Sequence, residues 1–281
     1  MIAAMWHRLR ALLPSRRAAL ASGRTIPDAL WDDTLAQLPF LQALTPTELQ
    51  QLRRLAAAFL DQKEFHGAHG LAITDAMALS IAVQACLPLL HFGPAAQALG
   101  WYDDFVMVVV HAAEVVAPRE VTDDIGVVHH YDEPLVGEAM ERGPVTLSWQ
   151  DVAAAGERVD EGTNVVVHEF IHKMDMRDGA ADGCPPLPRG FLGTHSSRAA
   201  RAAWHALLEP AYQAHREQVI IAERFGGATP WLDAYGAEAL EEFFPVACEA
   251  YFVNRARFAQ EFPTLPALFD AFFRPGTELQ K

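Results

Sequence analysis

The residues best suited to chemistry in this chain form the run His168-Glu169-Phe170-Ile171-His172. Two histidines four residues apart lie about 40° apart on one face of an α-helix, so both rings can direct a nitrogen at the same metal ion. Glu169 borders that face, where its carboxylate can take a proton from a water held by the metal. The run therefore predicts two zinc ligands and a general base on one helix.

A catalytic zinc ion needs a third protein ligand and keeps its fourth position open for water. No histidine follows soon after the run, since the next one is His195. The acidic stretch from residue 235 onward offers glutamates instead, and Glu238, Glu242 and Glu249 would share one face of a continuous helix. Spacing alone leaves these three glutamates open as the third ligand.

Several other residues could support the site. Asp175 could accept a hydrogen bond from a ligand imidazole, or it could cap the end of the helix. Glu249 could support a ligand in the same way or lie in an ion pair. Lone histidines usually pack in the interior or lie on the surface, so we expect none of the remaining ones near these elements to bind the metal; they are His111, His129, His130 and His195.

The composition narrows the classes of function. A formal net charge of −14 repels phosphate backbones, so we expect no direct nucleic-acid partner. Three widely separated cysteines form no disulfide framework and fit a reducing compartment. The longest apolar stretch, 76–92, is too short to span a membrane comfortably and predicts a buried helix instead of a transmembrane segment. The basic segment 1–25 lacks the apolar core of a secretory signal, so we expect a cytoplasmic protein with a loosely docked tail or a basic contact segment there.

Capping and turn signals indicate the elements that must position the chemical residues. Thr45 to Glu48 predicts a capping box that opens a helix ending near residue 60. The run 105–116 predicts a buried strand or a pair of strands. The run 145–149 predicts a strand that lies either at the edge of a substrate cleft or within the core sheet. The metal-binding run falls in a helix predicted from Asn164 to about Met176. Further helices are predicted over 196–225, 237–252 and 265–273, within one domain over 26–281.

Four stretches of this chain resemble a known family. They are Ile26 to Trp31, Gly143 to Trp149, His168 to Asp175 and Leu232 to Ala237. In them the chain resembles the Mlc titration factor A family of glucose-regulated metallopeptidases, which is similar to the catalytic domain of anthrax lethal factor. The resemblance implies an α+β, zincin-like fold with a mixed sheet, an HExxH helix beneath it and a C-terminal helical part.

The same resemblance implies roles for individual residues. His168, His172 and Glu242 would bind one zinc ion, and Glu169 would be the general base. Tyr235 would lend its hydroxyl to the oxyanion, where a hydrogen bond strengthens as negative charge develops, or it would be a packing residue beside the helix. The implied activity is that of an aminopeptidase-like zinc peptidase acting on peptides. The alternative is a binding protein that sequesters a glucose-responsive transcriptional repressor.

Two positions depart from the family pattern. Pro245 follows Glu242 by three residues, so the helix there must kink or begin nearby, which puts the placement of Glu242 in question. Met140 stands where relatives commonly carry tryptophan, and we expect it to change the rim of the cleft without altering the chemistry.

Overall fold

The computed structural model describes residues 25–113, 115–122, 128–135, 137–139 and 143–275. The basic N-terminal segment up to residue 24 and Met140 therefore lie outside the described residues. Among the helices that are described, none has the length and apolar character needed to cross a membrane.

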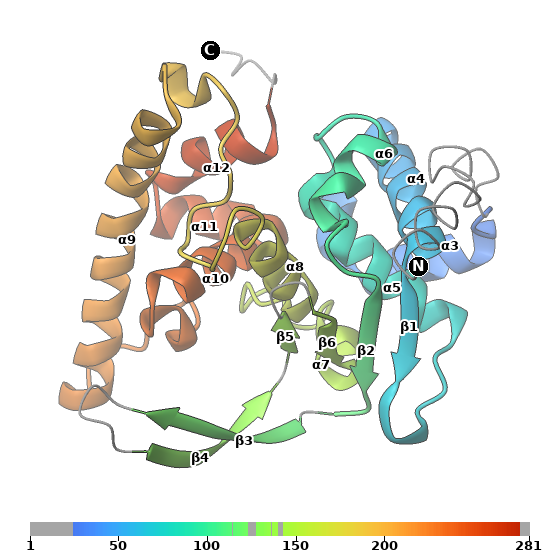
Figure 1. Ribbon diagram of the computed structural model, residues 1–281, viewed down its shortest axis with the longest axis horizontal. Helices are drawn as coiled ribbons and strands as arrows, with labels where there is room; N and C mark the ends of the chain where they lie inside the picture. The colour runs from blue at the N-terminus through green and yellow to red at the C-terminus, as the bar shows by residue number, and fades with distance from the viewer. Residues whose placement is uncertain (1–24, 114, 123–127, 136, 140–142, 276–281) are drawn as a thin grey trace, which may run out of the picture.

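The first part of the described chain is mostly helical, with one short strand among the helices, as Figure 1 shows in blue and teal. The predicted capping box opens α4, because the Thr45 hydroxyl accepts from the Glu48 amide while the Glu48 carboxylate accepts from the Thr45 amide. The buried helix predicted over 76–92 ends earlier than expected, at Cys86, because Pro88 lies in the 3-10 turn that follows. The helices are α3 (Asp28–Gln37), α4 (Pro46–Gln62), α5 (Asp75–Cys86) and α6 (Ala95–Ala98), with 3-10 turns at Pro39–Ala43, Ala68–Gly70, Leu87–Leu89 and Leu99–Tyr102.

A four-stranded sheet has the order β1-β2-β6-β5. The strands β1 (Glu64–Gly67), β2 (Met107–His111) and β6 (Val145–Ser148) are parallel, and β5 (Gly137–Ala139) runs antiparallel to β6. The expected mixed sheet is therefore confirmed. The expectation that 145–149 lies at the edge of a cleft is wrong, because β6 pairs on both sides and β5 is the outer strand.

The valine-rich run 105–116 contributes to two strands, which is the second of its two predicted alternatives. It contributes β2 to the main sheet and then the start of β3 (Val115–Thr122), which pairs with β4 (Val128–Leu135) in a separate antiparallel ribbon. This ribbon extends away from the main sheet across the lower part of the view (Figure 1). His129 and His130 belong to β4 of this ribbon, whereas His168 and His172 belong to a helix later in the chain.

The second half of the chain supplies the remaining helices. The helix α8 lies between α5 and the sheet on one side and α10 on the other (Figure 1). The helix α10 begins at Leu240 and continues through Pro245, whose missing amide falls in the second turn. The bounds are α7 (Trp149–Ala154), α8 (Val165–Asp175), α9 (Ser197–Phe225), α10 (Leu240–Val253), α11 (Arg255–Glu261) and α12 (Leu265–Phe273), with 3-10 turns at Phe191–Gly193 and Ala234–Ala237.

Candidate metal centre

The helix α8 is anchored at its start and along one face. The side-chain oxygen of Asn164 caps the helix by accepting a hydrogen bond from the Val167 backbone amide at 2.9 Å. The side-chain nitrogen of Asn164 donates to the side-chain oxygen of Gln84 on α5 at 2.9 Å. The Phe170 ring packs against Tyr102, with ring centroids 4.9 Å apart. These contacts bury one face of α8 in the core and direct the two histidines of the opposite face toward α10.

His168, His172 and Glu242 converge on one point. The two Nε2 atoms lie 3.2 Å apart, and Oε2 of Glu242 lies 3.1 Å from Nε2 of His172 and 3.4 Å from Nε2 of His168. Nitrogen and oxygen ligands at 2.0–2.1 Å from a tetrahedral zinc ion would lie about 3.3 Å from one another. The triangle of ligand atoms therefore has the size that a zinc ion requires, and no other described histidine, cysteine, aspartate or glutamate belongs to this group.

Glu249 holds the other nitrogen of His168. Its Oε1 lies 2.7 Å from Nδ1 of His168, and its Oε2 accepts a hydrogen bond from the backbone amide of Asn164. A carboxylate requires a donor, so the proton of a neutral His168 ring sits on Nδ1 and the lone pair of Nε2 faces the triangle. Of the two interpretations that the sequence left open for Glu249, the support of a ligand is the one that this contact favours.

The electrostatics of the triangle favour a cation. Burial alone would raise the pKa of Glu242, but hydrogen bonds from His168 and His172 lower it to about 2. Burial would lower the pKa of His168, yet its bonds to Glu242 and Glu249 raise it well above the usual value. The two carboxylates thus draw positive charge to this point, which a proton or a divalent cation can provide.

Glu169 lies on α8 beneath the outer strand of the sheet. The side chain is buried, and β5 passes so close that a Cβ on Gly137 would lie only 2.4 Å from Oε1 of Glu169. A glycine is therefore required opposite this carboxylate. Sequence reasoning did not single out Gly137, because a single glycine in a short stretch has many ordinary explanations.

Tyr235 lies at the exposed side of the site. Its ring centroid is 5.9 Å from that of His168, and the residue is 39% exposed, so it is not a core packing residue. It belongs to the 3-10 turn Ala234–Ala237, which Asp233 opens by accepting a hydrogen bond from the Tyr235 amide at 2.9 Å. The backbone carbonyl of Asp233 in turn lies 3.0 Å from Nε2 of His215 on α9.

Other residues singled out from the sequence lie elsewhere. Asp175 uses Oδ2 to accept hydrogen bonds from the amides of Asp182 and Gly183, so it anchors the loop after α8 and does not orient an imidazole. Glu238 precedes α10 and is not part of the triangle. His195 is exposed, and the His111 ring lies beside His69. The side chains of His129 and His130 fall outside what the structure describes.

Lys173 is a buried residue of α8 that the spacing argument missed. Its Nζ lies 2.6 Å from Oδ2 of Asp104 and 3.4 Å from the carbonyl of Gly143, just before β6. A buried ammonium needs such a partner, and the pair ties the metal helix to the sheet. A lysine directly after His172 reads as a surface residue in the sequence, because its partner Asp104 is distant in the chain.

A helix whose HExxH histidines meet a glutamate from a later helix is the arrangement of a metallopeptidase. A sequence profile of the glucose-regulated metallo-peptidase M90 family matches residues 12–274, and the chain belongs to this family.

Named relatives agree with this assignment. The chain is 34% identical over 245 residues to Mlc titration factor A of Klebsiella pneumoniae (strain 342), which covers 87% of this chain and 85% of that protein. It is 34% identical over 248 residues to Mlc titration factor A of Salmonella arizonae, with 88% and 91% covered. For the protein of that name from Edwardsiella ictaluri the identity is 33% over 245 residues, with 87% and 86% covered. The resemblance stated from four short stretches is therefore confirmed over most of the chain.

Proposed function

We propose that this chain is a zinc-dependent, aminopeptidase-like peptidase of zincin type, with His168, His172 and Glu242 as the metal ligands. The observation that carries the proposal is the triangle of ligand atoms with edges of 3.1–3.4 Å, which matches the ligand shell of tetrahedral zinc. The contact between Glu249 and His168 supports it, because it aims the lone pair of Nε2 into the triangle.

When bound, zinc supplies a Lewis acid that makes a water molecule acidic enough to deprotonate near neutral pH. Glu169 takes the proton from the attacking water and passes it to the leaving amine. The Tyr235 hydroxyl donates a hydrogen bond to the carbonyl oxygen as negative charge develops on it. The outer strand β5 offers its backbone to an extended peptide, which would place the scissile bond beside Glu169.

The test uses the purified full-length chain loaded with zinc and an alanine p-nitroanilide as substrate. Glu169→Gln keeps the shape of the side chain but removes the base, so we expect hydrolysis to fall by at least a hundredfold while zinc content stays the same. Glu209→Gln, on the exposed face of α9, is the matched control and should keep full activity. A wild-type protein that holds zinc but hydrolyses this substrate and a set of short peptides no faster than Glu169→Gln would refute the catalytic proposal.

The alternative function is regulatory binding. The relatives are named for titrating Mlc, and the identity of 32–34% to them extends over most of this chain. On this ground a glucose-responsive transcriptional repressor is the proposed protein partner. Purified Mlc-type repressor should then bind wild type and Glu169→Gln with equal affinity, whereas a partner that occupies the metal site as a substrate would distinguish the two.

A further inference from the structure

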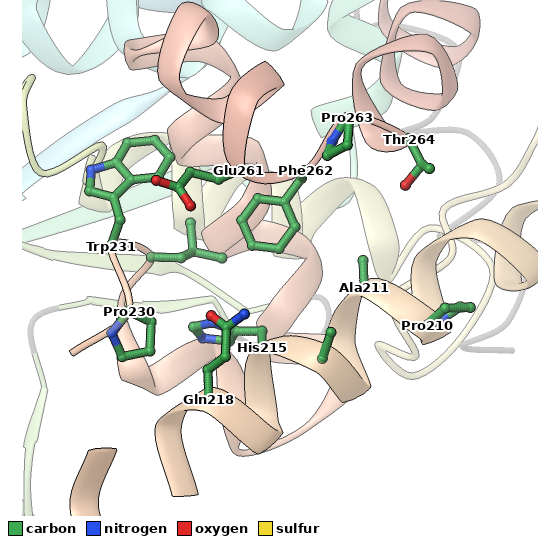
Figure 2. Close-up of a pocket in the computed structure, with 12 residues that line it drawn as sticks. Pro210, Ala211, His215, Gln218, Pro230, Trp231, Glu261, Phe262, Pro263 and Thr264 are labelled. Atoms are coloured by element: carbon green, nitrogen blue, oxygen red, sulfur yellow. The ribbon is translucent and has the colours of Figure 1, made fainter. Parts of the chain in front are cut away.

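A half-open cavity lies away from the metal centre. It has a volume of about 240 Å³ and is bordered by α9, by the segment 230–232 and by the junction of α11 and α12 (Figure 2). Its walls offer polar and apolar surface in about equal amounts, and the apolar part includes Trp231, Leu232 and Phe262 together with three prolines. None of the residues that line it belongs to the triangle of ligand atoms or is Glu169 or Tyr235.

His215 presents an unused acceptor at the wall of this cavity. The residue is 1% exposed, and its Nε2 must donate to the Asp233 carbonyl at 3.0 Å, because a carbonyl oxygen can only accept. The proton of the neutral ring is therefore on Nε2, and Nδ1 carries a lone pair. Burial lowers the pKa of His215, which favours this neutral form. Within the described chain Nδ1 has no hydrogen-bond partner, although a buried acceptor without a donor is costly.

The other polar groups of the cavity also favour a donor. Glu261 is the only charged side chain among the lining residues that the structure describes, and Gln218 adds an amide oxygen. Arg257 reaches Glu261 only at 3.7 Å, in a pair whose two side chains are about half exposed. Such a pair contributes little, so the carboxylate can still attract a cation that enters the cavity.

We propose that this cavity binds a small primary amine in its protonated form, carried on an aromatic or branched apolar body. The ammonium group donates one hydrogen bond to Nδ1 of His215 and lies toward Glu261. The apolar body packs against Trp231 and Phe262. The site does not depend on the proposed peptidase activity, because no residue of that activity lines it.

The cavity is connected to the metal centre through hydrogen bonds of His215 and Asp233. His215 contacts the carbonyl of Asp233 through Nε2, and the Asp233 side chain accepts from the amide of Tyr235. Two hydrogen bonds therefore connect the His215 ring, which would bind the amine, to Tyr235, the residue that faces the metal centre.

The test is a calorimetric titration of the full-length chain at pH 7 with four molecules of one shape, namely benzylamine, benzyl alcohol, toluene and benzoate. We expect benzylamine to bind most tightly, benzyl alcohol more weakly, toluene at least tenfold more weakly than benzylamine, and benzoate not at all. In His215→Phe the affinity for benzylamine should fall roughly tenfold, the effect of one lost hydrogen bond. His205→Phe makes the same change on α9 outside the cavity and should leave the affinity unchanged.

Two further variants locate the binding and guard against misfolding. Ala214→Phe fills the cavity from an exposed position and should abolish binding of benzylamine. Glu261→Gln removes only the charge and should reduce the preference for benzylamine over benzyl alcohol, a result that stands even if His215→Phe does not fold. Equal binding of toluene and benzylamine, no binding of any of the four, or binding that persists in Ala214→Phe, as expected of an amine held at the metal centre, would overturn the proposal.

Discussion

Glu249 does not reach the point where the three ligand atoms meet, yet it decides which nitrogen of His168 faces that point. Glu249→Gln keeps an oxygen for Nδ1 of His168 but turns an amide NH₂ toward the Asn164 amide, where two donors oppose each other. Loss of such support typically weakens metal binding 10- to 100-fold. We expect a drop of this size in zinc affinity, measured by competition with a fluorescent chelator.

Glu241→Gln is the control for this prediction. It removes the same charge from the same helix, α10, at a position outside the triangle. Its zinc affinity should equal that of wild type. If Glu249→Gln also binds zinc as wild type does, the contact between Glu249 and His168 is structural and does not tune the ligand.

At the level of single residues, the sequence predicted what depends on local spacing. The two histidines and Glu169 follow from one helical turn, and the structure places both histidines in the triangle. The three glutamates could not be ranked, because residues 238, 242 and 249 have the same helical phase in a continuous helix. The helix in fact begins at Leu240, so Glu238 lies before it. Glu242 and Glu249 lie two turns apart on the helix, so Glu242 reaches the Nε2 atoms and Glu249 reaches Nδ1 of His168.

The outer strand β5 carries a prediction about the general base. A methyl group at Gly137 would lie 2.4 Å from Oε1 of Glu169, so Gly137→Ala must displace the carboxylate. A shift of about 1 Å in a catalytic group can cost a hundredfold in rate. We therefore expect kcat for the anilide to fall about a hundredfold, with zinc affinity unchanged because the ligands do not move. Gly100→Ala, where the added methyl meets nothing within 4 Å, should keep its activity.

The C-terminal end of α8 carries a prediction about pH. Burial raises the pKa of Asp175 from 3.8 to about 6, against the lowering effect of the Gly183 amide. The folded zinc-free protein thus holds this proton more tightly than the unfolded chain does, so the stability due to Asp175 is complete below pH 3.8 and is lost as pH rises through 6. The difference of 2.2 pKa units corresponds to roughly 3 kcal/mol.

Asp175→Asn tests this directly, because asparagine keeps an oxygen for the two loop amides but cannot ionise. Urea unfolding of the zinc-free proteins should show the variant gaining stability over wild type between pH 4.5 and pH 7.5. Asp33→Asn, at an exposed position of α3 and not among the groups that act on Asp175, is the control and should show no such pH-dependent gain. A constant difference for Asp175→Asn as well would show that this carboxyl titrates normally.

At the level of elements, helices were predicted better than strands. The capping box at Thr45 is a local signal, and it is present in the structure; the predicted start of the metal-binding helix at Asn164 also agrees with the structure, where Asn164 caps α8. The predicted edge of the sheet was wrong because β6 is mostly buried and pairs on both sides, whereas the true edge, β5, has only three residues and no strand-forming side chains to reveal it. Pairing between strands distant in the chain decides which one is outermost, and spacing does not encode that pairing.

For the molecule as a whole, the candidate metal site joins segments that are far apart in the chain. The helix α8 supplies two members of the triangle and α10 the third, 70 residues later. A ligand that binds only the folded state adds about 4 kcal/mol when its free concentration is a thousand times its Kd. For a chain of 281 residues, about 4 kcal/mol corresponds to a shift in Tm of roughly 7 °C.

Removal of zinc with a chelator should therefore lower Tm by roughly 7 °C, and added zinc should restore it. His172→Ala should melt at one temperature with or without zinc, because two remaining ligand atoms hold the ion too weakly to matter. Glu169→Gln should keep the whole shift although it has lost hydrolysis, since Glu169 is not in the triangle. Calorimetric melts of the three proteins thus separate metal binding from catalysis. A wild-type Tm that does not respond to zinc would contradict zinc binding at this centre. The binding of a protein partner would then be the function to test.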